Sequence, residues 1–139
     1  TPIIWNSNFY MSKESLEILK EVVDVWLPDF KYGNDRCALE LSLVPNYVEI
    51  VTRNLKDARG DMVIRHLILP GHIKCCSFPV LRWIAKHRRD ALVNVMDQYT
   101  PHYLVLREER FSKLRRRVDY DEFRKVLELA KELELHLVE

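Results

Sequence analysis

Two residues of opposite charge, Asp29 and Lys31, follow the apolar segment Val22–Leu27 and stand two positions apart. Side chains at positions i and i+2 of an extended chain point to the same side, so this pair could enter one pocket. A carboxylate beside an ammonium group could grip a zwitterionic ligand. The alternative is a local ion pair at the exit of a strand, and the spacing alone favours that alternative.

Arg65 lies inside the apolar segment Val63–Leu69, and a buried arginine is rare unless it is paired. Its partner is Asp24, Asp29, or the carboxylate or phosphate of a ligand, and the sequence does not separate these three. His66 must face the opposite side of the same strand. For His66 we expect a hydrogen-bonded histidine beneath a helix rather than a catalyst.

Polar residues also follow the apolar residues near the start of the chain. Asn6 and Asn8 have the same two-residue spacing as Asp29 and Lys31. Isolated asparagines at such positions are typical of Asx-turns, which is the interpretation that we favour for both.

His72 stands in a loop that contains proline and glycine, and Cys75 and Cys76 follow shortly after it. Imidazole and thiolate groups could bind zinc, but this spacing matches no familiar zinc motif and no second pair of ligands is evident. We therefore predict no metal site. With Cys37 the cysteines number three, which is no disulfide framework, so a reducing cytoplasmic setting fits best.

Composition excludes several classes of function. The net charge of +1 does not direct the chain to nucleic acid, and no apolar run approaches the roughly 20 residues of a membrane helix. The arginine-rich stretch from His102 to Arg117 could contact phosphates, but its interspersed acidic residues favour a solvated loop. No Ser-His-Asp arrangement and no pair of catalytic carboxylates stands out.

These polar groups follow four apolar segments that predict strands, each succeeded by a helical pattern. The segments are Ile3–Asn6, which we expect to be buried, Asp24–Leu27, Val63–Leu69 and Ala91–Met96. His136–Val138 could add a short terminal edge strand. Trp5 and Trp26, near strand ends, could stack on an adenine, but core packing is the safer expectation.

Helix starts are marked by residues that favour N-caps: Ser12, Asn46, Ser77 and Asp119. A short helix is expected over Asp35–Leu43. Asp119 with Glu122 forms an Asp variant of the capping box.

Alternation of strands and helices predicts one α/β domain over residues 1–139, with a parallel sheet and right-handed crossovers. The carboxyl ends of the strands then meet at one edge, where such folds place their chemistry. About four βα units are half of a barrel. We therefore expect open sheet edges and an uncovered inner face, so the chain should either curl into a small open sheet or pair with another copy or another chain.

Four segments in chain order carry a resemblance to a known family: Asn6–Asn8, Val23–Tyr32, Val63–His72 and Asn94–Pro101. They resemble the second half of radical S-adenosylmethionine proteins related to pyruvate formate-lyase activating enzyme. The strings Arg-His-Leu-x-Leu-Pro-Gly and Met-x-Gln-Tyr-x-Pro are the more specific ones. The helix Tyr120–Leu135 is similar to the closing helix of that family.

The resemblance implies a partial (βα)6 TIM-like barrel with a 4Fe–4S cluster held by a Cys-x3-Cys-x2-Cys loop. The cluster cleaves S-adenosylmethionine to a radical, which activating enzymes use to take hydrogen from a glycine of a partner enzyme. By this resemblance the cofactor and substrate pocket is lined by seven residues. Asp29, Lys31 and Arg65 would hold the amino-acid and ribose parts, Ser7 and Asn8 would line the cavity, and Gln98 and Tyr99 would face the adenine or the substrate.

The chain departs from the family because it contains no Cys-x3-Cys-x2-Cys loop. A 4Fe–4S cluster needs those thiolates, so we predict that this chain alone is not competent for the radical chemistry. The expected partner is either an N-terminal half that supplies the cluster or a second copy bound through the exposed sheet edge or the inner face, and a protein substrate is a further possible partner. The alternative is a cluster-free module that binds a small ligand or a protein.

Overall fold

The computed structural model describes residues 1–102 and 104–138, which form a five-stranded sheet in the order β1-β2-β3-β4-β5. The strands are β1 (Ile4–Ser7), β2 (Val25–Pro28), β3 (Asp61–Leu67), β4 (Leu92–Met96) and β5 (His136–Leu137). Every neighbouring pair is parallel, as the alternation of elements predicts. The short terminal strand that the sequence suggested is present as β5.

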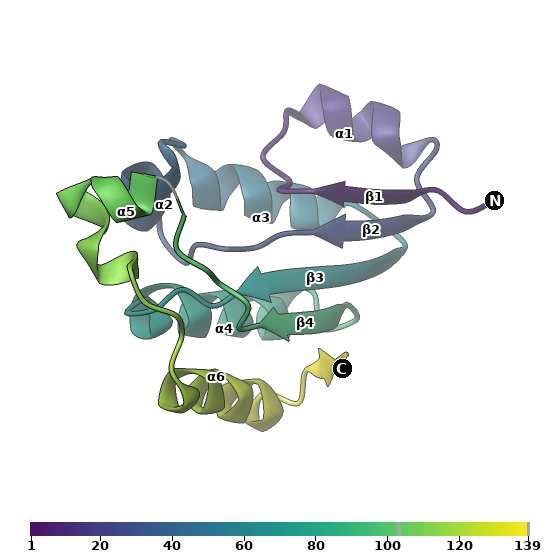
Figure 1. Cartoon of the computed structure of the whole chain (residues 1–139). Coiled ribbons are helices and arrows are strands. Elements are labelled where there is room, and N and C mark those ends of the chain that lie inside the picture. Colours follow the sequence, from purple (N-terminus) through teal and green to yellow (C-terminus); the bar gives the residue numbers. More distant parts are fainter. Residues whose placement is uncertain (103, 139) are drawn as a thin grey trace.

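Helical segments connect the strands. They are α1 (Lys13–Lys20), α2 (Asp35–Ser42), α3 (Tyr47–Asp57), the π-helix η1 (Ile73–Ser77), α4 (Phe78–His87), α5 (Leu104–Arg107), the 3₁₀ segment η2 (Glu109–Leu114) and α6 (Tyr120–Glu132). In Figure 1, α3 and α4 lie behind the sheet, and the labelled strands all point toward the end where α2 and α5 lie. None of the helices in the described part of the chain has the length and apolar character that a membrane span requires.

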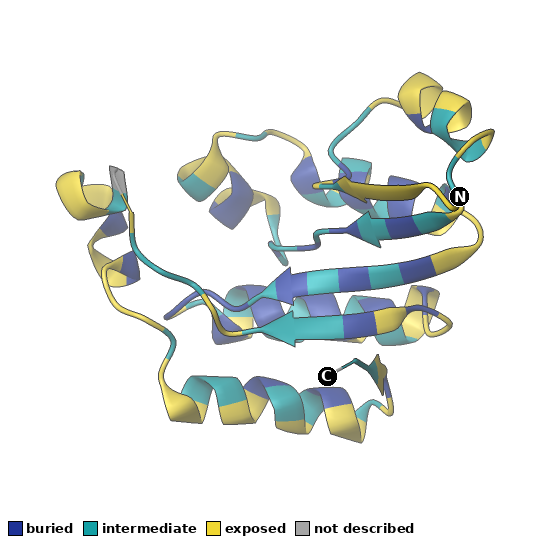
Figure 2. Ribbon diagram, turned by 45° about the vertical axis from the view of Figure 1, so that its right-hand side comes forward, coloured by how far each residue is buried: buried dark blue, intermediate teal, exposed yellow. Residues whose placement is uncertain are grey.

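The two faces of the sheet differ in cover, as the alternation of burial along β3 shows (Figure 2). Met62, Ile64 and His66 are buried against the helices, whereas Arg65 and Leu67 on the other face are only half-buried. The main core therefore lies between the sheet and its helices. Each fully buried aliphatic side chain there contributes roughly 2 kcal/mol to folding.

Local sequence signals account for several helix starts. The Ser12 hydroxyl accepts a hydrogen bond from the Ser15 N–H, and Asp119 and Glu122 form the predicted capping box. Asn46 does precede α3, but its side chain makes no capping bond because the residue adopts a left-handed conformation, with φ of 55°. The predicted short helix α2 is also present.

The expectation of a buried first strand is wrong. β1 is mostly exposed and appears in yellow at the edge of the sheet in Figure 2. Trp5 is 38% exposed, whereas Trp26 of the neighbouring strand is 1% exposed and packs as predicted. The physical reason is position: β1 pairs on one side only, so an apolar edge strand has fewer elements to cover it.

Two further expectations need correction. Ser77 does not cap α4, because helical backbone already begins at Ile73 in η1, and the Ser77 side chain makes no cap bond. The stretch from His102 to Arg117 is not only loop, since it contains α5 and η2. Phe111 and Leu114 of η2 are buried, which anchors this otherwise charged segment.

Candidate functional site

Arg65 has a definite partner at the carboxyl end of the sheet. Its Nε and Nη2 atoms lie 2.8 and 2.7 Å from Asp29 Oδ1, and Nη2 also donates to Asn6 Oδ1. The pairing of β2 with β3 continues past the strand end through a bridge between Asp29 and Arg65. Of the open partners, the structure selects Asp29, while Asp24 accepts from the Ile3 N–H at 2.7 Å.

The guanidinium is less buried than its place in an apolar strand predicts. The Arg65 side chain is 22% exposed on the inner face of the sheet. Asn6 does not form the expected Asx-turn, since its side-chain oxygen accepts from Arg65. Asn8 does form one, and its Oδ1 accepts from the Tyr10 N–H at 3.0 Å.

Lys31 is fixed through its backbone and leaves its ammonium group available. The Lys31 N–H donates to the hydroxyl of Tyr47 at 2.9 Å, and burial raises the pKa of Tyr47 to about 12. Lys31 Nζ lies 5.9 Å from the centre of the Tyr32 ring. Among the described residues no carboxylate pairs with it, so the local ion pair with Asp29 does not form.

Three adjoining cavities surround this lysine at the strand ends. Lys31 lines all three, and Asp29 lines the two smaller ones. Asn8 and Tyr47 belong to a cavity of about 80 Å³, Arg65 to one of about 180 Å³, and a third of about 260 Å³ reaches toward η2. A carboxylate, an ammonium and a half-exposed guanidinium therefore converge at the edge where parallel sheets bind ligands.

The other residues named by the resemblance divide into two groups. Tyr99 lines the third cavity and donates its hydroxyl to the Leu114 carbonyl at 2.8 Å. Ser7 uses its hydroxyl to accept from the Phe9 N–H at 3.0 Å, and Gln98 is exposed. Neither Ser7 nor Gln98 lines one of these three cavities.

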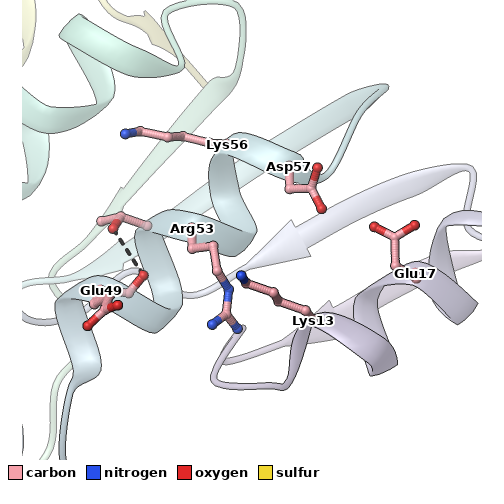
Figure 3. A pocket seen from close by; sticks show the side chains of 7 residues that line it. Lys13, Glu17, Glu49, Arg53, Lys56 and Asp57 are labelled. Carbon is pink, nitrogen blue, oxygen red and sulfur yellow. Dashed lines mark hydrogen bonds between the residues drawn. The ribbon is translucent and has the colours of Figure 1, made fainter.

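A larger groove of about 590 Å³ lies elsewhere, between α1 and α3 (Figure 3). Its charged lining mixes both signs and includes Lys13, Glu17, Arg53 and Asp57. Two of its carboxylates, Glu17 and Asp57, are already held by Lys20 at 2.9 and 2.8 Å. The groove belongs to the surface of two helices and has no share in the cluster at the strand ends.

One side-chain cluster was not expected. The ligand-type atoms of Cys37, His72, Cys75 and Cys76 all lie within 4.8 Å of one another. The sequence puts three of these residues in one segment but gives no reason for Cys37, on α2, to join them. Folding brings α2 against η1, and only this contact completes the set of four.

The loop before α2 fits tightly against η1. A Cβ atom on Gly33 would stand 2.6 Å from the Cys75 carbonyl oxygen and 2.8 Å from Pro79 Cβ, so a larger residue would collide. The Asn34 side chain joins both segments: its amide donates to the Cys75 carbonyl, and its oxygen accepts from the Cys37 N–H, each at 2.8 Å.

Burial shifts the titration of this cluster. Burial disfavours the charged forms, so it lowers the pKa of His72 and raises the pKa values of the Cys75 and Cys76 thiols. The neighbouring Cys37 thiol raises the pKa values of both cysteines further, whereas a hydrogen bond with Cys76 lowers the pKa of Cys75 and the Gly33 N–H lowers that of Cys76.

His66 is confirmed as a hydrogen-bonded histidine beneath helices. Its Nδ1 donates to the Phe30 carbonyl at 2.8 Å, and its Nε2 accepts from the Ser77 hydroxyl at 2.7 Å. A carbonyl can only accept, which fixes the neutral tautomer. Complete burial lowers the pKa of His66 to about 4.

Several arginines of the stretch from His102 to Arg117 pair with acidic residues, some within the stretch and some on α6. Arg116 binds Glu122 at 2.6 Å, and Glu122 also accepts from the Gly71 N–H at 2.8 Å. The hydrogen bond from Arg116 is the first cause that lowers the pKa of Glu122 to about 2. These contacts tie α6 to the loop after β3 and agree with a structural role for Arg116.

Comparison with known proteins gives a sequence relative and similar solved structures. No family model matches the chain. An uncharacterised protein of Methanocaldococcus jannaschii is 43% identical over 140 residues, which are 99% of this chain and 40% of the relative. The chain thus spans less than half the length of that relative.

One similar solved structure is the crystal structure of a domain of pyruvate-formate lyase-activating enzyme from Bacteroides vulgatus. The two superpose with a TM-score of 0.71 over 95% of this chain and 77% of that one, at 14% sequence identity. An identity this low bears on the fold and not on the activity. The parallel α/β architecture and this superposition together show that the chain has the fold of a pyruvate-formate lyase-activating enzyme domain.

Proposed function

We propose that this chain forms part of the S-adenosylmethionine and substrate pocket of a radical enzyme related to pyruvate formate-lyase activating enzyme. The observation that carries the proposal is the convergence of Asp29, Lys31 and Arg65 on adjoining cavities at the carboxyl ends of the strands. The fold similarity to a domain of such an enzyme supports it.

The residues at the strand ends fit the charged part of S-adenosylmethionine. Its amino-acid group carries one ammonium and one carboxylate. Lys31, which has no ion-pair partner among the described residues, would take the carboxylate, and Asp29 would face the ammonium. Asp29 Oδ1 accepts both bonds from Arg65, so this guanidinium holds the carboxylate in place.

The residues do not fit a 4Fe–4S cluster. In such a cluster each thiolate binds a different iron, so the sulfurs spread around the cube. Here the three cysteines of the chain converge with His72 within 4.8 Å, which suits one ion. We infer that a separate segment or chain supplies the cluster.

The exposed strand β1 is the proposed place for that partner. Ile4 is 59% exposed, and the free side of β1 offers unpaired backbone groups to a further strand. A second copy of the chain could occupy the same edge. Sedimentation in the presence and absence of the partner separates the two, because self-association needs no partner.

Calorimetry with S-adenosylmethionine tests the pocket. Lys31→Met keeps the length of the side chain and removes its charge, so we expect affinity to fall about 10- to 100-fold with the loss of one charge-assisted bond. Lys13→Met, in the groove between α1 and α3, is the matched control and should bind like the wild type.

Two results would contradict the proposal. Wild-type chain that shows no binding, alone or with its cluster-bearing partner, would favour the alternative of a protein-binding module. Reconstitution of the lone chain with iron and sulfide should give no 4Fe–4S spectrum. A cluster that cleaves the cofactor would overturn the inference that another part is required.

A further inference from the structure

We propose that Cys37, His72, Cys75 and Cys76 bind a single zinc ion in a tetrahedral site that joins α2 to η1. This site is distinct from the cavities around Lys31, and its failure would leave the proposal for the strand ends intact. It also departs from the expectation, drawn from residue spacing, that the chain has no metal site.

Distances between the ligand atoms match one shared ion. Cys37 Sγ and Cys75 Sγ are 3.8 Å apart, and His72 Nδ1 lies 3.7 and 3.2 Å from these two sulfurs. Bonds of about 2.3 Å to sulfur and 2.0 Å to nitrogen at tetrahedral angles imply separations of about 3.8 and 3.5 Å. All four ligand atoms lie within 4.8 Å of one another, so the shell closes with shifts of about 1 Å or less.

The chemical types are those of zinc. Three thiolates and one imidazole form a known structural set, and soft sulfur ligands disfavour magnesium and calcium. Because four protein ligands fill a tetrahedral shell, no position remains for a substrate or a reactive water. The ion would therefore have a structural role rather than a catalytic one.

Neighbouring groups hold the ligands in place. Asn34 bonds the backbone of both Cys37 and Cys75, so the two ligand-bearing segments are coupled without metal. Gly33 permits close approach of its loop to η1, and its N–H faces the sulfur of Cys76. Support of this kind around first ligands is a regular feature of built metal sites.

A route for the ion exists as well. Cys37 and Cys76 are 8% and 1% exposed, but His72 and Cys75 are only half-buried. Cys75 also lines a surface cavity of about 310 Å³. A hydrated ion can therefore reach two ligands first and complete its shell with the two buried thiols.

A bound ion would have one mechanical effect on the molecule. Cys37 follows the loop that carries Lys31, whereas His72 follows β3, which carries Arg65. One ion on these ligands would lock the exits of β2 and β3 together. The zinc site would thus stabilise the geometry of the strand ends without contact with a ligand there.

The test is zinc binding by the reduced full chain. Purified chain, stripped of metal and kept under thiol reductant, should take up one zinc per molecule in competition with a chromophoric chelator. Cobalt in place of zinc should give the intense visible bands of tetrahedral coordination together with thiolate-to-cobalt charge transfer. Zinc should also raise the melting temperature.

Ligand variants sharpen the test. Cys37→Ser and His72→Gln should each weaken zinc binding by more than the roughly 10- to 100-fold typical of losing a supporting residue. His102→Gln, an exposed histidine outside the cluster, is the matched control and should bind as the wild type does. Circular dichroism of each variant verifies that it folds.

Several results would overturn the proposal. Wild-type reduced chain that takes up much less than one zinc, or octahedral cobalt spectra, would each exclude the site, and neither depends on a variant. Undiminished affinity in Cys37→Ser would do the same. A disulfide between Cys37 and Cys75 that persists under reductant would also overturn it and assign these two cysteines to a structural cross-link.

Discussion

Arg65 and His66 are neighbours in β3, both are polar, and the sheet gives them opposite surroundings. His66 points to the helices, is fully buried, and has both ring nitrogens satisfied by protein groups. Arg65 points to the uncovered face and borders an open cavity. Burial of a sheet face beneath helices, and not residue type, therefore distinguishes a polar side chain that stabilises this fold from one that can contact a ligand.

Removal of the His66 side chain is the strongest test of this difference between the covered and the uncovered face of the sheet. His66→Ala leaves the Phe30 carbonyl and the Ser77 hydroxyl without their buried partner and creates a cavity. We expect a loss of about 3 to 5 kcal/mol in the free energy of unfolding. Urea denaturation measures it, with exposed His102→Ala expected within about 0.5 kcal/mol of the wild type. A loss below 1 kcal/mol would show that His66 is not a structural tie.

Lowering the pH should reduce the free energy of unfolding through the same residue, His66. The pKa of His66 falls from its ordinary 6.5 to about 4 on folding, so the unfolded chain binds the extra proton between these values. Its contribution to stability is complete above pH 6.5 and decreases as the pH falls to 4, by about 3 kcal/mol in all.

Comparison with His66→Gln isolates this pH effect, because glutamine does not titrate. The difference in unfolding free energy between the two proteins should shrink steadily from pH 6.5 to pH 4. Glu122, with its pKa lowered to about 2, acts in a lower range and should affect both proteins alike. Parallel stability curves over the upper range would contradict the assignment.

Arg65→Met should have the smallest effect on stability. The ion pair with Asp29 is partly exposed, and such pairs contribute about 0 to 1 kcal/mol. We therefore expect urea denaturation to give a loss below about 1 kcal/mol, in contrast to His66→Ala. A loss of several kcal/mol would mean that the uncovered face is as structural as the covered one.

Much of this arrangement could be predicted from local pattern. Alternation along β3 predicts that Arg65 and His66 face apart, and the polar residues that end β2 predict a cluster at the sheet edge. Exposure of Trp5 could not be predicted, because an apolar tripeptide looks the same in an edge strand as in a central one. The choice of Asp29 over Asp24 depends on the register between β2 and β3, which neither strand encodes alone.

The Cys and His cluster was missed for a related reason. Spacing along the chain reveals metal sites only when ligands come in short motifs, whereas Cys37 and His72 are 35 residues apart. A usable signal was Gly33, one of three glycines in the chain, placed directly before a capping asparagine. A glycine there indicates that another segment must approach the backbone closely.

The order β1-β2-β3-β4-β5 has a consequence for how such proteins can be divided and recombined during evolution. Each strand pairs only with the strands that precede and follow it in the sequence. A break in the chain beside an outer strand therefore crosses no other connection and leaves every strand pair of the remaining sheet intact. Fusion and fission of genes at that boundary are therefore topologically neutral. A sheet with this order can be encoded by separate genes, provided that the separately made chains can still pair along β1.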